Sequence, residues 1–216
     1  MSGRRTQSPR PPARRLSSRL GRPTGEPFDF TASMARLCED IADRSETFSH
    51  LDMSRCLVTI SQARNRNAWG TQAKLTPLRF EGGARTTVRR GRQWGCQSVV
   101  HDGRDMLYVV TFVLPRFQDQ TPREKLITVF HELYHISPDF NGDIRRFPGR
   151  CHAHTGSQKQ YDAHMGELVD EYLSCEPPRS LYEWLGLSFD ELTERHGSVT
   201  GLKIRIPKLL PVAATS

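Results

Sequence analysis

Residues 121–136, TPREKLITVFHELYHI, carry the start and stop signals of a helix. The opening TPRE places a threonine hydroxyl before the helix, a proline at its first position and a glutamate at its third, which is the capping-box arrangement. Pro138 follows two residues after Ile136 and ends the helix, because the residue before a proline is biased away from helical angles. The stretch therefore predicts one helix, around which the rest of the domain is arranged.

The predicted helix has two chemically different faces, because successive side chains are about 100° apart. The apolar face consists of Leu126, Val129, Phe130, Leu133 and Ile136. The opposite face consists of Glu124, Thr128, His131 and His135. We expect the apolar face to pack on a sheet and both imidazoles to project into a cleft.

Two histidines frame a glutamate in the HELYH segment, residues 131–135. Imidazoles four residues apart on a helix can bind one Zn²⁺, and the glutamate then lies beside the open coordination position of the metal. Such a site acidifies water and polarises a carbonyl, while the carboxylate accepts the proton. We therefore assign His131 and His135 as metal ligands and Glu132 as the catalytic base. The alternative, two structural histidines, would place them within the apolar face.

A third metal ligand is expected downstream of the helix. Of His152 and His154, only one is expected to bind the metal. We favour His154, because Thr155-Gly156 gives the backbone freedom to turn back, and keep His152 as the alternative. A glutamate of the next helix, Glu167 or Glu171, is the competing choice. Weaker candidates are Asp139, Asp143 and Cys151.

The net charge of +7 is unevenly distributed. Residues 1–27 contain seven arginines and one acid, are rich in Pro, Ser and Gly, and have few apolar residues, which predicts a disordered basic tail. Residues 64–92 contain eight Lys and Arg residues against a single acid. Both regions are expected to bind nucleic acid non-specifically, and Trp69, Phe80 and Trp94 add stacking surfaces. The candidate contacts in the band are Arg85, Arg89, Arg90 and Arg92. A solvated sheet edge protected by arginine is the alternative interpretation.

Periodicity predicts the other elements. Helices are expected over 31–48 and roughly 158–174, strands over 55–62 and 73–80, and two short helices followed by a strand or extended arm after Pro177-Pro178. Because Pro77 cannot donate a hydrogen bond to a neighbouring strand, we expect the strand at 73–80 to lie at an edge of the sheet or to be bent. Residues 94–101 and 106–114 flank Asp102-Gly103, a hairpin signal, and the apolar run 106–114 is expected to be a central strand. We divide the chain into a tail (1–27), a main domain (28–176) and C-terminal helices with an extended arm packed on that domain (177–216).

The cysteine pattern and the hydropathy of the sequence indicate the cellular compartment in which we expect the protein. The five cysteines are widely spaced, odd in number and form no CxxC pair, which favours reduced thiols in a cytoplasmic protein. No stretch approaches 18 consecutive apolar residues, so no membrane partner is expected.

Four segments resemble the phage and prophage metallopeptidases: PLRFEGG at 77–83, FVLPRF at 112–117, the block from 124 to 150, and the HAH that follows. The resemblance covers roughly residues 50–175 and is specific in the central block. It implies a zinc-dependent peptidase-like domain with His131 and His135 as ligands and Glu132 as base. It also suggests a looser kinship with the minimal zincin domains of SprT-type proteins, which associate with DNA, although their zinc-ribbon cysteines are missing here.

Together these features predict an α+β, minimal zincin-like domain. A small twisted sheet packs against the HExxH helix, and additional helices follow at the C-terminus. The expected function is a zinc-dependent metalloendopeptidase that hydrolyses protein or peptide substrates, including DNA-associated protein. The alternative is a nucleic-acid-binding phage accessory protein whose metal site is structural or inactive.

Overall fold

The fold is organised by a mixed three-stranded sheet with the strand order β2-β8-β3. The computed structural model describes residues 25–67, 69–146 and 158–212. The central strand β8 (Tyr108–Leu114) runs parallel to β2 (Cys56–Gln62) and antiparallel to β3 (Ala73–Pro77). Most residues of β8 are buried, because a strand with apolar side chains on both faces needs cover on both. The predicted central strand is confirmed, and β3 lies at the edge, as Pro77 indicates.

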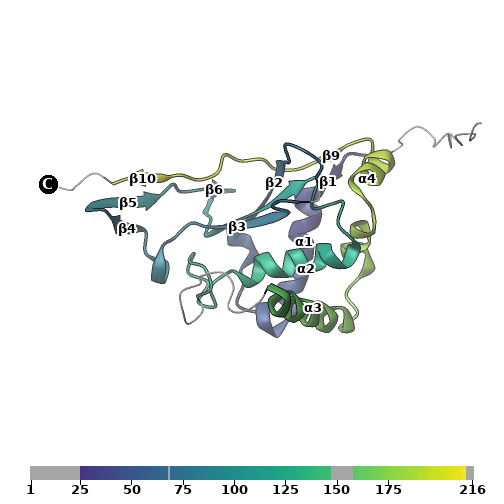
Figure 1. Cartoon of the computed structure of the whole chain (residues 1–216), viewed down its shortest axis with the longest axis horizontal. Helices are drawn as coiled ribbons and strands as arrows, with labels where there is room; N and C mark the ends of the chain where they lie inside the picture. Colours follow the sequence, from purple (N-terminus) through teal and green to yellow (C-terminus); the bar gives the residue numbers. More distant parts are fainter. Residues whose placement is uncertain (1–24, 68, 147–157, 213–216) are drawn as a thin grey trace, which may run out of the picture.

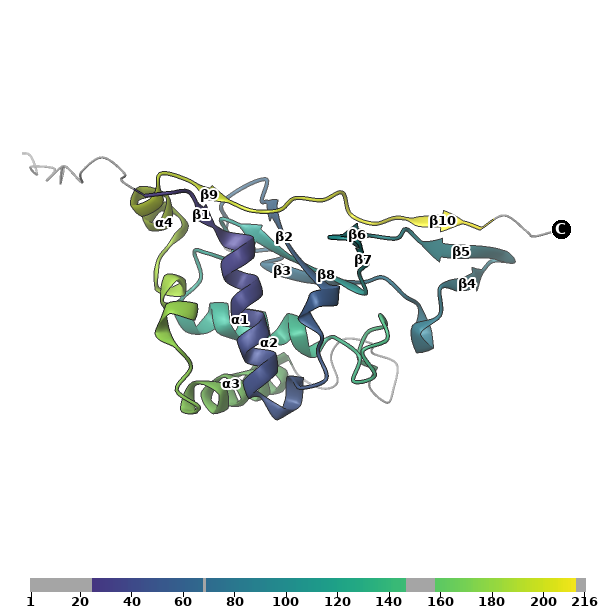
Figure 2. The ribbon, with the colours of Figure 1, turned by 180° about the vertical axis from the view of Figure 1, so that it is seen from behind.

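Three helices lie on one side of this sheet (Figures 1 and 2). They are α1 (Phe30–Arg44), α2 (Pro122–Tyr134) and α3 (Gln158–Ser174). Helix α1 contacts β2, α2 contacts β3, and α3 packs on α2. A 3-10 turn, η1 (Glu46–Phe48), completes the predicted 31–48 helix. The chain therefore has an α+β fold, as the sequence predicts.

Helix α2 begins with the predicted capping box. The Thr121 hydroxyl accepts a hydrogen bond from the Glu124 N–H, and the Glu124 carboxylate accepts one from the Thr121 N–H. Its apolar residues are buried in the main core beneath the sheet, which confirms the predicted packing face. Both expectations succeed because helix caps and helical periodicity are local properties of the chain.

A buried lysine on α2 fastens the C-terminal part of the chain to this helix. Lys125 is 1% exposed, and its ammonium group donates hydrogen bonds to the carbonyl oxygens of Leu185 and Leu187, at 2.8 and 2.7 Å. Burial lowers the pKa of Lys125 to about 8, because removing the ammonium from water disfavours its charged form. The two carbonyl oxygens accept hydrogen bonds from the ammonium group in place of the water that burial removes.

The predicted hairpin at Asp102-Gly103 is correct at the turn and wrong for its strands. Both turn residues have positive φ, but the paired strands are only β6 (Val100–His101) and β7 (Arg104–Asp105). Residues 108–114 pair instead with β2 and β3, because this apolar run gains burial between two strands and under the helices. Of the segment predicted at 94–101, residues 94–96 belong to β5 of a second sheet, which has the order β10-β5-β4.

The C-terminal part forms short elements and then an extended segment. The short elements are η4 (Arg179–Leu181), η5 (Glu183–Gly186), α4 (Phe189–His196), β9 (Val199–Thr200) and β10 (Leu209–Pro211). Strand β9 pairs with β1 (Phe28–Asp29), and β10 pairs with β5 (Arg92–Cys96), which in turn pairs with β4 (Thr86–Arg89). Between β9 and β10 the chain runs along the side of the main sheet opposite the helices (Figures 1 and 2).

Two expectations bear on regions that the structure describes only in part. Residues 1–24, most of the predicted basic tail, lie outside the described residues. Within the described ranges, no helix combines the length and hydropathy needed to cross a membrane.

Candidate active site

His131 lies in the last turn of α2 and His135 is the residue that caps this helix, with their ring centroids 4.6 Å apart. Both side chains are half-buried. Tyr161 of α3 packs against them, with its ring centroid 4.9 Å from that of His131 and 6.1 Å from that of His135. Two imidazoles at this spacing are a donor set that suits Zn²⁺, so the pair fits the predicted metal.

Glu132 lies between α2 and the edge strand β3. Its side chain is 8% exposed, and its Oε2 accepts a hydrogen bond from the Leu75 N–H at 2.6 Å. Burial raises the pKa of Glu132 to about 7, although the Leu75 N–H and the nearby charge of Lys74 act in the opposite direction. A carboxylate with a pKa near neutrality suits proton transfer at neutral pH.

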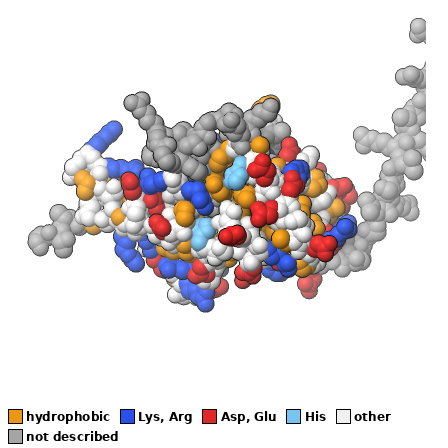
Figure 3. Space-filling model, turned by 90° about the horizontal axis from the view of Figure 1, so that it is seen from below, with side chains coloured by type: hydrophobic (Ala, Val, Ile, Leu, Met, Phe, Trp, Pro, Cys, Tyr) orange, Lys and Arg blue, Asp and Glu red, His pale blue; other side chains and the backbone are white. Residues whose placement is uncertain are grey.

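A cavity of about 390 Å³ opens beside His131 and Glu132. Its remaining lining comes from Glu124, Ile127 and Thr128 of α2, from Gln120 before this helix, and from residues 71–73, which lead into β3. Figure 3 views the side of the molecule that carries α2 and α3, and it shows histidine side chains at this surface beside acidic ones. Glu124, Thr128 and His131 of the predicted polar face line the cavity, whereas His135 is not among the described residues that line it.

The third ligand is not assigned by the described residues. Within them, no group of three or more His, Cys, Asp or Glu side chains is arranged to hold a metal ion. The Glu167 carboxylate lies 3.6 Å from Nδ1 of His164 on α3. His152 and His154 lie outside the described residues.

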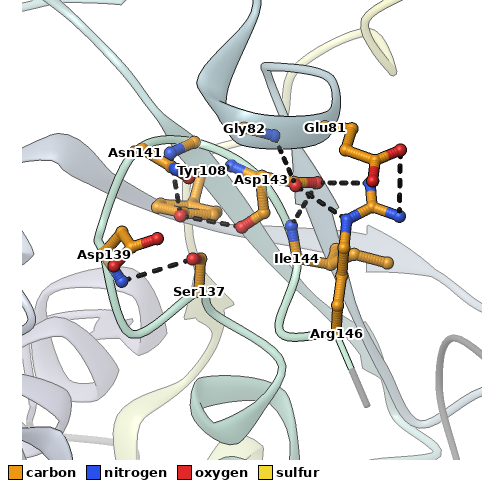
Figure 4. A network of polar contacts seen from close by, with 10 residues as sticks. Glu81, Gly82, Tyr108, Ser137, Asp139, Asn141, Asp143, Ile144 and Arg146 are labelled. Atoms are coloured by element: carbon orange, nitrogen blue, oxygen red, sulfur yellow. Dashed lines mark hydrogen bonds and ion pairs between the residues drawn. The ribbon is translucent and has the colours of Figure 1, made fainter. Parts of the chain in front are cut away.

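A network of polar contacts holds the loop that follows α2 (Figure 4). The buried Asp143 carboxylate accepts hydrogen bonds from the N–H groups of Gly82 and Ile144 and from two nitrogens of the Arg146 guanidinium, at 2.8–3.1 Å. Arg146 also lies 3.8 Å from Glu81. These contacts occupy the carboxylate of Asp143, one of the weaker ligand candidates, with hydrogen-bond donors of the protein itself. They also tie the end of the described loop to the turn after β3.

Tyr108 anchors the same loop to the central strand. Its hydroxyl donates to the Asp143 carbonyl and accepts from the Gly142 N–H, both at 2.9 Å, and the side chain is fully buried (Figure 4). Sequence periodicity indicates only that Tyr108 is buried in a strand. Its partners are more than thirty residues away, so no local pattern identifies this role.

We expect Tyr108→Phe to destabilise the protein by about 1–3 kcal/mol, because the substitution keeps the ring but leaves the Gly142 N–H and the Asp143 carbonyl without this partner. Urea unfolding measures the change. Tyr182→Phe is the matched control, since the Tyr182 hydroxyl makes no hydrogen bond within the described residues. Equal stability of the Tyr108 variant and wild-type protein would contradict the anchoring role.

The arginines of the 64–92 band do not form one surface. Arg66 pairs with Asp190, and Arg79 pairs with Asp105. Arg85, Arg89, Arg90 and Arg92 lie together on and beside the β4–β5 hairpin, and all four are exposed. The structure thus separates arginines paired on the main body from a cluster at one end of the molecule.

The chain also matches a known protein family. The family model described as "putative phage metallopeptidase" matches residues 31–163, which span α1, the main sheet, α2 and the start of α3. This match covers more than half of the chain, so the protein belongs to the phage metallopeptidase family. At the level of the family, it is a metallopeptidase. No curated protein and no solved structure matches the chain significantly.

Proposed function

We propose that the protein is a zinc-dependent endopeptidase in which Glu132 is the catalytic base and His131 and His135 are metal ligands. The observation that carries this proposal is the buried Glu132 carboxylate at a cavity that His131 also lines, with the His135 ring next to that of His131. Membership of a metallopeptidase family supports the same reaction class.

The residues of the site have separate roles in this proposal. Zn²⁺, when bound by the two imidazoles, supplies a Lewis acid that acidifies water and polarises a carbonyl. Glu132 accepts the proton of the attacking water and later delivers it to the leaving amine. The Leu75 N–H fixes the orientation of the carboxylate, and Tyr161 packs against both imidazoles and restricts their rotation.

The edge strand beside the cavity favours an extended polypeptide as substrate. β3 pairs with β8 on one side only, and residues 71–73 at its start line the cavity. An edge strand offers backbone donors and acceptors to an added strand, so a peptide lying along β3 would pass the cavity with its carbonyl groups near Glu132.

Zinc removal tests the proposed reaction. The zinc-loaded full chain is incubated with a mixed peptide library, and mass spectrometry identifies internal cleavage. We expect cleavage to stop when a chelator removes the metal and to return when zinc is added back, because the metal supplies the Lewis acid. A chain that refolds and rebinds zinc but cleaves no peptide would contradict the proposal.

The third ligand remains a proposal, and two single substitutions separate the candidates. His154→Ala is expected to lower zinc occupancy strongly, whereas His152→Ala should leave it nearly unchanged, because Thr155-Gly156 directly after His154 gives the backbone freedom to turn back towards the histidine pair. Zinc per chain is measured by mass spectrometry of metals after dialysis. The reverse order of the two variants would transfer the role to His152.

The competing function is a nucleic-acid-binding accessory protein in which the metal is structural or inactive. The exposed arginines of the β4–β5 hairpin favour this alternative. It predicts that zinc loss unfolds the domain, while the zinc-loaded chain hydrolyses no peptide. The two properties can also coexist, in which case the proposed substrate is a protein bound to DNA.

A further inference from the structure

The second sheet projects from the main body as a basic ribbon, which we define as residues 84–97 and 208–212. It contains β4, β5 and β10 and lies at the end of the molecule to which the C-terminal segment runs (Figures 1 and 2). Its charged side chains are five cations and no acid: Arg85, Arg89, Arg90, Arg92 and Lys208. Lys208 lies outside the 64–92 band in the sequence. The pairing of β10 with β5 places it on the same sheet as the four arginines.

The positive charge of the basic ribbon is not neutralised by neighbouring acids. All five cations are exposed, and none has an ion-pair partner within the described residues. Arg89 and Arg92 are directly opposite in the register of β4 and β5. Like charges at such positions destabilise a strand pair, so this arrangement is not explained by the stability of the hairpin.

The tip of the basic ribbon has the form of a two-stranded projection. β10 pairs with residues 94–96 of β5, and the Val212 N–H bonds to the Gln93 carbonyl, so residues 88–92 extend past the third strand. Arg90 and Gly91 both have positive φ and form the tight turn of the tip. Val88 beside this turn is 70% exposed.

One face of the basic ribbon continues toward the loop that follows α2. Arg89 and Thr87 line a cavity of about 440 Å³ together with Arg146 and Asp143 of that loop. Figure 3 shows Lys and Arg side chains at this end of the molecule, on the side that also carries α2 and α3. Arg146 is paired with Asp143 and lies near Glu81, so the cations without an ion-pair partner at this end of the described residues are those of the basic ribbon.

We propose that the basic ribbon is a docking surface for duplex DNA, whose major groove receives the two-stranded tip while the surrounding cations contact phosphates. A two-stranded β-ribbon fits the major groove, and unpaired cations gain binding energy by releasing the counterions of the phosphates. Single-stranded nucleic acid is less suited, because its binding relies on aromatic stacking platforms. The tip has none, and Trp94, the ribbon's one aromatic residue, is half-buried. This surface requires neither zinc nor peptide hydrolysis.

Two quadruple variants of the full chain with equal change in net charge test the proposal. The ribbon variant changes four arginines of the basic ribbon to glutamine, at Arg85, Arg89, Arg90 and Arg92. The control variant changes four exposed arginines outside the basic ribbon and outside the 64–92 band, which lack ion pairs within the described residues, at Arg36, Arg179, Arg195 and Arg205. Circular dichroism and thermal unfolding verify that both variants fold.

Fluorescence anisotropy then measures binding to a labelled duplex of about 20 base pairs between about 50 and about 200 mM salt. The ribbon variant is expected to bind at least about 10-fold more weakly, and its log–log salt slope should be shallower by about 0.9 for each phosphate that the protein no longer neutralises. The control variant should bind within about 3-fold of wild-type protein. Equal weakening of both variants, or no weakening of either, overturns the proposal. Tighter binding of the matching single strand than of the duplex overturns the assignment to duplex DNA.

Discussion

Glu132→Gln is expected to retain its zinc and to lose peptide hydrolysis. The carboxylate accepts a proton from water and is not assigned as a metal ligand, so an amide of nearly the same shape should leave the metal site intact. The amide cannot accept that proton, and removal of a general base lowers the rate by roughly 100- to 10,000-fold. Zinc per chain and the rate of peptide cleavage are measured on the same preparation.

Glu194→Gln provides the matched control for this change. Glu194 is an exposed residue of α4, outside the cavity that Glu132 lines, and its substitution removes the same charge. This variant should keep both its zinc and its activity. If Glu132→Gln also released the zinc, the carboxylate would have to be reassigned from base to ligand.

His131→Ala and His135→Ala are each expected to lose zinc and, with it, activity. Each substitution removes one of the two imidazoles that lie 4.6 Å apart on α2. The loss of affinity should exceed the roughly 10- to 100-fold that removal of an outer-shell partner costs, because a direct ligand is removed. Competition with a zinc-binding dye measures the affinity.

His164→Ala separates loss of a ligand from loss of any nearby histidine. His164 lies on α3, where its ring packs against Tyr134, with ring centroids 5.5 Å apart. We expect this variant to bind zinc as the wild-type protein does. If His164→Ala lowered zinc affinity as much as His131→Ala, the ligand assignment would be wrong.

The helix that carries the site was predictable because its signals are local. The capping box at Thr121 and Glu124, and the opposite placement of apolar residues and histidines, follow from spacing within one segment. The helix predicted at 158–174 likewise coincides with α3. For these elements, short-range preference and tertiary packing favour the same structure.

Strand pairing and side-chain partners were less predictable because they depend on residues far apart in sequence. The apolar run 106–114 follows a turn signal and has the pattern of the second strand of a hairpin. Its residues in β8 pair instead with β2 and β3. The bond between the Leu75 N–H and Glu132 joins residues 57 positions apart, and no sequence period encodes it. Similarly, the sequence does not indicate that Asp190 neutralises Arg66 while the ribbon arginines have no acidic partner within the described residues.

The location of zinc in the full chain tests the central assignment most directly. Crystals of the zinc-loaded protein are measured on both sides of the zinc absorption edge, so that the anomalous difference map locates the metal. We predict one peak about 2.0–2.1 Å from a ring nitrogen of His131 and at the same distance from a ring nitrogen of His135, with the Glu132 carboxylate outside the coordination sphere. A zinc peak that contacts only one of these histidines, or that lies at another part of the chain, would contradict the assignment.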